Sequence, residues 1–194
     1  MEKIVLFDGT SVEKWTKRDG SPCHWTVENG AMTVLPRQGD IVSTETYGDA
    51  HIHVEWMEPD MPEEKGQGKG NSGVYIHGCY ELQVLDSYGI ETPCYNDCGA
   101  IHNMYAPLTN ACKPALEWQT YDIYFRAPRF NEDGTVKENA YVTVIQNGVM
   151  VQNNIELYST TPGGVGNEKV AEGPLLLQDH WNLVSFRNIY IEKY

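Results

Sequence analysis

Residues 141–151, with the sequence YVTVIQNGVMV, decide the fold class of this 194-residue chain. The first six residues have the period-two pattern of a half-buried strand. Asn147 and Gly148 follow, and both tolerate the positive φ that a two-residue hairpin turn requires. The stretch therefore predicts two antiparallel strands joined by a tight turn.

The same period recurs along the rest of the chain. It is found at residues 51–56, 71–77, 80–85, 121–126, 175–178 and 184–191. No segment of helical length shows a period near ~3.6. Many short strands, with a turn every ~8–12 residues, are typical of a β-sandwich or barrel. We therefore expect an all-β fold, in one domain over residues 1–194.

Charge and hydropathy exclude several classes of protein. Lysine and arginine number 14 against 27 acidic residues, which gives a net charge of −13. An excess of negative charge argues against nucleic acid as a partner, because its phosphates require a basic surface. The apolar runs are much shorter than the ~20 residues of a membrane-spanning helix. The acidic Glu2 and the short apolar stretch after it do not resemble a signal peptide, so we expect a cytoplasmic protein or one whose leader has been removed.

The cysteines leave several alternatives open. Five are present, at positions 23, 79, 94, 98 and 112, so at least one is unpaired within the chain. Cys94 and Cys98, four residues apart, could form a small disulfide or half of a zinc site. No second pair with finger-like spacing follows, which favours free thiols or one local disulfide.

Three segments lack the strand pattern and are rich in turn residues: 58–70, 88–114 and 158–173. Loops longer than ~15 residues inside a compact domain are usually functional or disordered. We therefore expect at least two of the three to frame a binding site.

Polar side chains share faces on several of the predicted strands. These sets are Glu81 with Gln83; Asn71, Tyr75 and His77; His51, His53 and Glu55; and Gln178 with His180. If the strands were neighbours, they would form one sheet face lined with carboxylates, amides, imidazoles and tyrosines. Such a face suits sugar hydroxyls, and aromatic rings suit the flat side of a pyranose. The alternative is that these are ordinary solvated faces.

The aromatic residues divide between core and site. We expect Trp15 and Trp25 to pack in the core. Trp118 could lie either in the core or at the sugar-binding site. Tyr75 and Tyr105 are better candidates for stacking on a sugar, because one faces the predicted cleft and the other lies in a long loop.

In the order and spacing of its motifs, the chain resembles a bacterial family, the 3-keto-disaccharide hydrolases (3-keto-glucoside 1,2-lyase/3-keto-2-hydroxy-glucal hydratase domains, formerly domain of unknown function 1080). The matching segments are 6–10 (LFDGT) with Trp15, 25–30 (WTVENG), 47–49 with 55–56, 71–74 (NSGV), 80–86 (YELQVLD), 99–101, 113–114 with 117–118, 147–148, 173–174 with 177–180 (LQDH), and 186–189 (FRNI). The chain departs from the family pattern at His102-Asn103, where Tyr-Gly is commoner, and at Trp181, where glycine is usual.

The resemblance implies a concanavalin/laminin-G-like jelly roll, a sandwich of two curved antiparallel sheets with its site on the concave face. It also implies a small carbohydrate substrate, a glycoside already oxidised to a ketone at C3, and a periplasmic or secreted location. The ketone acidifies the C2 proton, so that a base can remove it and expel the C1 substituent before water adds back. This chemistry requires a base near C2, a group that stabilises the ketone oxygen and an acid near the leaving oxygen.

Roles in this chemistry follow from the residue types. We expect Glu81 as base or metal ligand, His180 as acid–base or ligand, and Lys113 and Arg187 to polarise the ketone. The residues expected to bind substrate are Glu55, Asn71, Tyr75, Gln83, Gln178 and Tyr105. The structural alternatives are a Glu81–Arg187 ion pair, a capping role for His180 and rim charges at Lys113 and Arg187.

Two further questions stay open. A divalent cation at the enolate oxygen would suit the chemistry, although no motif names the metal. The alternative function is a non-catalytic carbohydrate-binding module, because this fold serves lectins as well as enzymes. The presence of Glu81, His180, Lys113 and Arg187 together favours the enzyme, since pure binding needs no acid–base pair.

Overall fold

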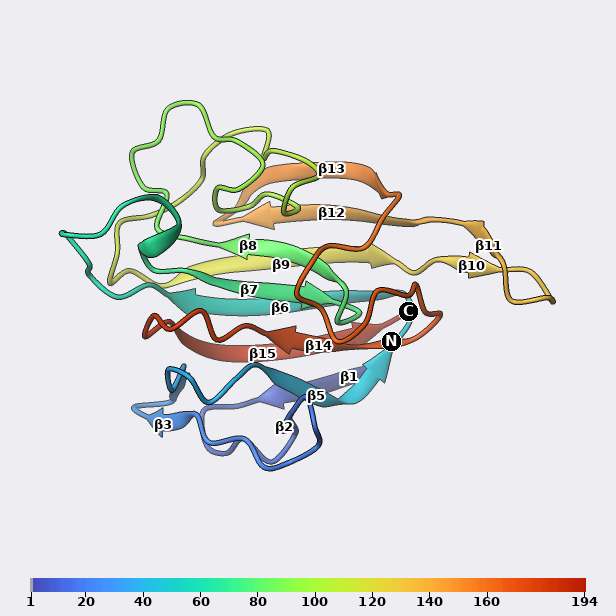
Figure 1. Cartoon of the computed structure of the whole chain (residues 1–194), viewed down its shortest axis with the longest axis horizontal. Helices are drawn as coiled ribbons and strands as arrows, with labels where there is room; N and C mark the ends of the chain where they lie inside the picture. Colours follow the sequence, from blue (N-terminus) through green and yellow to red (C-terminus); the bar gives the residue numbers. More distant parts are fainter. Residues whose placement is uncertain (1) are drawn as a thin grey trace.

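The computed structural model describes residues 2–194, and it is built almost entirely of antiparallel strands (Figure 1). No α-helix occurs within these residues, and none of their elements is a helix long and apolar enough to cross a membrane. The elements are β1 (Glu2–Phe7), β2 (Trp15–Lys17), β3 (Thr26–Glu28), β4 (Ala31–Thr33), β5 (Ile41–Tyr47), β6 (Ala50–Met57), the 3₁₀ turn η1 (Gly66–Gly68), β7 (Ser72–Ile76), β8 (Tyr80–Val84), β9 (Gln119–Arg126), β10 (Arg129–Phe130), β11 (Val136–Glu138), β12 (Ala140–Gln146), β13 (Val149–Leu157), β14 (Gly173–Leu177) and β15 (Ser185–Lys193).

Two large sheets make up the sandwich. The eight-stranded sheet has the order β13-β12-β9-β6-β15-β4-β3, and β1 also pairs with β15. The five-stranded sheet has the order β2-β5-β14-β7-β8. A small hairpin of β10 and β11 projects at one end of the molecule (right in Figure 1). This architecture confirms the expected jelly-roll sandwich.

The core lies between the two sheets because the strands alternate in polarity. In β6, Ile52, Val54 and Trp56 are fully buried and belong to the core, whereas His51 and His53 lie on the opposite face of the strand. Such alternation is expected when one face of a sheet packs on a core and the other faces solvent. Trp15 and Trp25 are also buried in this core, as predicted.

The hairpin predicted from residues 141–151 is confirmed. Strands β12 and β13 pair across the turn, where Gln146 opposes Val149. Asn147 and Gly148 have φ values of 52° and 81°. Both turn residues are therefore in the left-handed conformation that the sequence predicted.

His77 differs from its prediction. Strand β7 ends at Ile76, and His77 follows with a left-handed φ of 52°. Its ring is buried and packs edge-on against Tyr47 and Phe125, at centroid distances of 5.0 and 4.5 Å. The change of backbone conformation turns this side chain into the core, so it does not share a face with Asn71 and Tyr75.

The cysteines are all free thiols. Cys94 is exposed and Cys98 is buried, and no disulfide joins them. The one group of His, Cys, Asp and Glu ligand atoms gathered within residues 2–194 does not include Cys94.

Candidate functional site

A polar pocket of about 220 Å³ lies on the face of the five-stranded sheet that is turned away from the core. It is lined by Gln67, Asn71, Tyr75, Glu81, Gln83, His102, Pro162, Gly163, Gln178 and His180. Six of these ten were predicted as site residues: Asn71, Tyr75, Glu81, Gln83, Gln178 and His180.

Strands β7 and β8 form the floor of the pocket. Tyr75 pairs with Glu81, and Gly73 pairs with Gln83. The intervening Leu82 and Val84 point into the core, so Glu81 and Gln83 point away from it. Gly73 leaves space beside the carboxylate, because a Cβ at this position would lie 2.8 Å from Glu81 Oε1. The alternating pattern of residues 80–84 (YELQV) therefore places the Glu81 carboxylate and the Gln83 amide side by side on the outer face of β8.

His102 reaches the pocket because residues 99–102 run as an extra strand along β8. The Gln83 N–H donates to the Ala100 carbonyl (2.9 Å), and the His102 N–H donates to the Glu81 carbonyl (3.0 Å). The His102 Nδ1 atom then lies 2.9 Å from Gln83 Oε1 and 4.0 Å from Glu81 Oε2. The long loop between β8 and β9 thus supplies an imidazole next to the central carboxylate.

A chain of hydrogen bonds orients this imidazole. The Gln83 amide group donates to Asn71 Oδ1 (2.9 Å), and the Asn71 amide donates to the Gln67 carbonyl (2.7 Å). Gln83 Oε1 is therefore left as an acceptor for His102, which places the proton on Nδ1. The Nε2 atom of neutral His102 then carries a lone pair that can accept a proton.

Glu81 has the properties of a general base. The residue is only 4% exposed, and burial raises its pKa from 4.5 to about 7, although the Tyr75 hydroxyl opposes this shift. The negative charge of Asp40 contributes a smaller rise in the pKa. A carboxylate with a pKa near 7 is a stronger base than an exposed one, and about half of it is still ionised at pH 7.

The two histidines differ in their surroundings. Burial lowers the pKa of His102, and the nearby His180 lowers it further, which keeps the His102 imidazole neutral. His180 lies at the exposed rim of the pocket. The turn before it is held by Asp179, whose carboxylate accepts hydrogen bonds from the Gly39 and Trp181 N–H groups. Asp179 thus holds the turn beside His180 in place.

Gln178 and Tyr75 close one side of the pocket. The Gln178 N–H continues the β14–β7 ladder by donating to the Gly73 carbonyl (3.0 Å). Its amide donates to the Tyr75 hydroxyl (3.1 Å), which in turn donates to the Pro162 carbonyl (3.1 Å). Gln178 Oε1 is buried without a hydrogen-bond partner, so it is available to a ligand hydroxyl.

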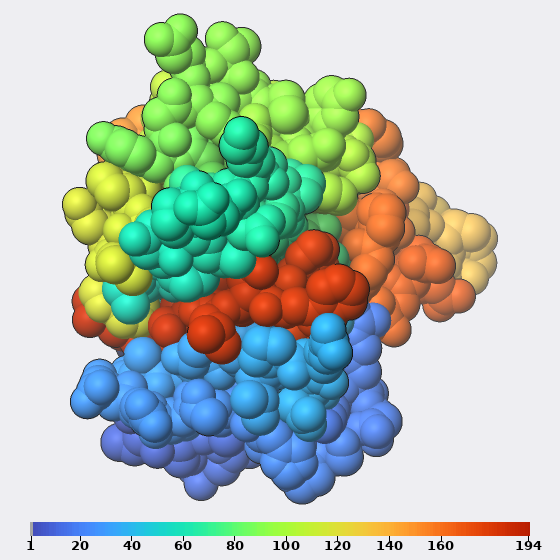
Figure 2. Space-filling model, turned by 60° about the vertical axis from the view of Figure 1, so that its left-hand side comes forward, coloured from blue at the N-terminus to red at the C-terminus, as the bar shows by residue number. Residues whose placement is uncertain are grey.

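All three of the long loops contribute to the pocket, which agrees with the expectation that at least two would. Gln67 comes from the loop 58–70, His102 from 88–114, and Pro162 and Gly163 from 158–173. The first two loops contact one another, because the Gln67 amide donates to the Asn96 carbonyl (2.8 Å). Figure 2 shows the first loop (teal) packed between the second (green) and the chain near residue 180 (red).

Glu55 and Arg187 are not at the pocket. They lie on β6 and β15 of the eight-stranded sheet, where the Arg187 Nε–H donates to Glu55 Oε2 (2.6 Å). The Arg187 guanidinium also covers the ring of Trp118, 4.0 Å from its centroid. Both residues are on the outer face of this sheet, with the core between them and Glu81. The condition for one shared polar face, that all these strands are neighbours, is not met, because β6 and β7 belong to different sheets. The placement of Glu55 and Arg187 at the site with Glu81 is therefore wrong.

Lys113 and Tyr105 also lie outside the residues that line the pocket. The Lys113 ammonium donates to the Trp118 carbonyl (2.9 Å), near the end of the loop 88–114. Tyr105 packs edge-on against Tyr158 at a centroid distance of 6.0 Å. Among the described residues, the pocket lining includes no lysine or arginine.

Four lining residues were not among the predicted ones: Gln67, His102, Pro162 and Gly163. All four lie in long loops, where the period-two pattern carries no information about the direction of a side chain. His102 had appeared only as a departure from the family pattern.

The pocket residues do not form a ready site for the divalent cation considered above. Glu81, His102 and His180 do not bring three ligand atoms within 4.8 Å of one another; in residues 2–194 only Glu58, Cys98 and Cys112 do so. The groups available for catalysis in this pocket are therefore side chains of the protein.

Comparison with known proteins gives the family. A family model described as the 3-keto-alpha-glucoside-1,2-lyase-like domain matches residues 2–192. A search of curated proteins found no match.

Solved structures similar to this chain include carbohydrate-related proteins. A protein from Parabacteroides distasonis, provisionally assigned as a glycosyl hydrolase, is 39% identical with a TM-score of 0.91, over 99% of this chain and 84% of that one. A second such protein from this organism is 20% identical with a TM-score of 0.72, over 99% and 94% of the two chains. The carbohydrate-binding module CBM66 of Bacillus subtilis shares the fold at 12% identity and a TM-score of 0.52, over 92% and 96%. The family match over nearly the whole chain, together with the 39% identity, shows that this protein belongs to the 3-keto-alpha-glucoside-1,2-lyase-like family of carbohydrate-processing enzymes.

Proposed function

We propose that this protein cleaves 3-keto-glycosides by removing the C2 proton, eliminating the C1 substituent and then adding water. The observation that carries the proposal is the buried Glu81 carboxylate, with a pKa of about 7, in a polar pocket beside His102 and His180. The family match supports the substrate class, and the pocket supports acid–base chemistry.

Glu81 takes the C2 proton in the first step. The electron pair of the C2–H bond moves toward the C3 carbonyl, and negative charge develops on the ketone oxygen. The C1–O bond then breaks, and the leaving oxygen takes a proton. His180 is our candidate for this acid, because it lies at the open rim where a leaving group would exit.

In the hydration step the elimination runs in reverse, with water in place of the leaving group. The neutral His102 can accept a proton from water at Nε2, because its Nδ1–H is held by Gln83. Water adds to C1, and protonated Glu81 returns its proton to C2. The net result is hydrolysis. Glu81 is restored directly, and the cycle closes when the proton that His102 took from water passes to His180, which gave its own proton to the leaving oxygen.

Stabilisation of the ketone oxygen falls to neutral donors. Gln67 and Gln178 each donate one amide hydrogen within the protein, which leaves each a second to offer, and the pocket lining described above has no lysine or arginine. Prearranged neutral donors in a site shielded from water can stabilise developing negative charge. Lys113 and Arg187 have no part in this scheme.

The proposal is tested by incubating the protein with a 3-keto-glucoside and with the same glucoside unoxidised, each with and without a chelator. We expect release of the aglycone from the ketone only, since a C2 proton beside an alcohol carbon is too weakly acidic for a carboxylate to remove. Binding of both sugars without release from either would favour a carbohydrate-binding module instead.

A further inference from the structure

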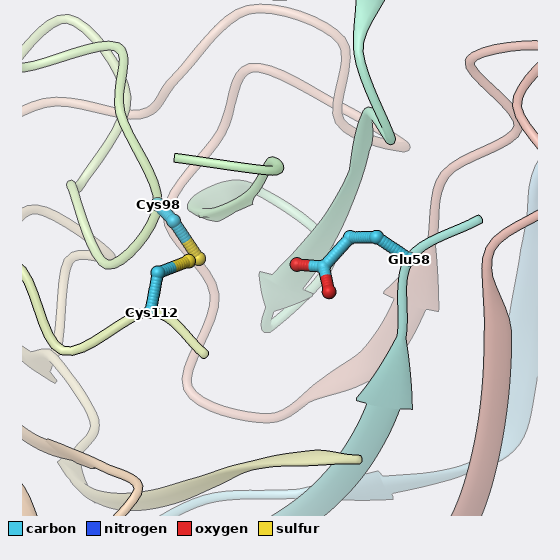
Figure 3. Close-up of side chains that lie close together, drawn as sticks. All are labelled: Glu58, Cys98 and Cys112. Atoms are coloured by element: carbon cyan, nitrogen blue, oxygen red, sulfur yellow. The ribbon is translucent and has the colours of Figure 1, made fainter. Parts of the chain in front are cut away.

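A second group of reactive side chains lies apart from the pocket, where Glu58, Cys98 and Cys112 meet. Their ligand atoms all lie within 4.8 Å of one another. Figure 3 shows the two thiols pointing toward each other and the Glu58 carboxylate pointing toward them. The three residues come from the end of β6, from the loop after β8 and from the segment before β9.

We propose that Glu58, Cys98 and Cys112 bind one zinc ion, in a site that is structural and separate from the carbohydrate pocket. Tetrahedral zinc, with bonds of ~2.3 Å to sulfur and ~2.0–2.2 Å to oxygen, holds its ligand atoms roughly 3.4–3.8 Å apart. The observed spacing is close enough for small side-chain rotations to reach this geometry. Two sulfur ligands select a thiophilic cation over calcium or magnesium, which prefer oxygen.

The charge of the cluster supports a cation. Glu58 is fully buried, and none of the ion pairs formed within residues 2–194 involves it. A buried carboxylate without a cation is costly, and a bound divalent ion would compensate it.

The carboxylate is already oriented by neighbours, as the ligands of metal sites usually are. The Trp56 indole N–H donates to Glu58 Oε1 (2.7 Å), and the Gln119 amide donates to Oε2 (2.6 Å). Each oxygen retains a second lone pair for a metal. These bonds hold the carboxylate in place without neutralising it.

Gln146 can complete the coordination. It is fully buried, and its Oε1 has no hydrogen-bond partner. Its amide nitrogen lies 3.4 Å from Cys98 Sγ and 3.7 Å from Cys112 Sγ. Rotation of the amide by half a turn would put the oxygen in that place, at the distance expected between two zinc ligands. Cys112 is only partly buried and gives the ion a route from solvent.

Such an ion would join the loop 88–114 to the eight-stranded sheet, through Glu58 after β6 and Gln146 in β12. Residues 99–102, which carry His102 into the pocket, follow Cys98 directly. The zinc would therefore fix one end of the segment that positions His102.

The proposal is tested on reduced protein, freed of metal and reductant and titrated with Zn²⁺ under anaerobic conditions against a chromogenic chelator. We expect one zinc per chain in the wild type and in Cys94→Ser, which removes an exposed thiol of the same loop. Cys98→Ser and Cys112→Ser should abolish binding, and Glu58→Gln should weaken it at least tenfold. Saturation at one hundred times the Kd should raise the Tm by about 5–10 °C.

Two measurements on the wild type keep the test independent of how the variants fold. Co²⁺ should give a thiolate-to-metal charge-transfer band, and Zn²⁺ should protect Cys98 and Cys112 from alkylation while Cys94 reacts. Failure of the wild type to bind zinc would overturn the proposal, as would zinc binding without protection of these two thiols. Formation of a Cys98–Cys112 disulfide that persists in place of zinc, under the anaerobic conditions of the titration, would overturn it equally.

Discussion

Replacing Glu81 by glutamine should stop catalysis and stabilise the protein at the same time. The substitution keeps the shape of the side chain and removes the basic oxygen. Loss of one general base typically lowers the rate by a factor of ~10²–10⁴. The fold and the affinity for sugars should be largely kept, since the new amide side chain still fills the same space beside Gly73.

The stability change follows from the raised pKa. Burial raises the pKa of Glu81 from 4.5 to about 7, and a tenfold change in a proton equilibrium is worth ~1.4 kcal/mol, which gives about 3 kcal/mol in total. Between these two values the folded state binds more protons than the unfolded state, so stability falls as the pH rises from 4.5 through about 7. Above that range the folded wild type carries the full cost of the buried charge, and Glu81→Gln does not.

The assay compares thermal unfolding at about pH 8 and about pH 4.5, together with turnover of a 3-keto-glucoside at the higher pH. For a chain of this length, about 3 kcal/mol corresponds to a Tm increase of roughly 6–12 °C, expected only at the higher pH. Glu91→Gln, at an exposed glutamate of the loop 88–114, serves as the matched control and should change neither quantity. Near-wild-type turnover in Glu81→Gln would refute the role of Glu81 as the base. A Tm difference between the variant and the wild type that is the same at both pH values would refute the cost assigned to the buried charge.

Three other predictions concern the surroundings of Glu81. Turnover of the wild type should rise with pH through about 7, because Glu81 must be ionised to accept the C2 proton; a pH–rate profile that is flat there would contradict this. His102→Ala should lower kcat by ~10²-fold or more, measured under saturating substrate, and an unchanged kcat would exclude His102 from proton transfer. Arg187→Ala should leave kcat within about twofold of the wild type, because Arg187 pairs with Glu55 on the outer face of the other sheet; a large loss would show that this face acts on the substrate.

Much of the fold was predictable because an alternation of polar and apolar residues in the sequence indicates a half-buried strand directly. The hairpin at Asn147-Gly148 and the pairing of Glu81 with Gln83 on one face needed only local information. The two departures from the family pattern are also explained by the backbone. Asn103 and Trp181, which stand where glycine is commoner in the family, have left-handed φ values of 58° and 68°. Glycine adopts that conformation without strain, so its frequency at these positions has a conformational cause.

The rest of the site depended on tertiary arrangement. The pattern shows that Glu55 and Glu81 each point to a polar face, but not that β6 and β8 belong to different sheets. His77 left its expected face because of one positive φ at a strand end, which no periodicity reports. His102 reached the pocket through a loop that pairs with β8, and that pairing follows from long-range contacts.

The removal of the C2 proton can be tested most directly by cleaving a 3-keto-glucoside in D₂O and measuring deuterium at C2 of the released sugar. Incubation of the sugar product alone corrects for spontaneous exchange, and Glu81→Gln corrects for exchange without catalysis. The proposed mechanism predicts one deuterium at C2 for each turnover by the wild type. Release of the aglycone with hydrogen retained at C2 would contradict it.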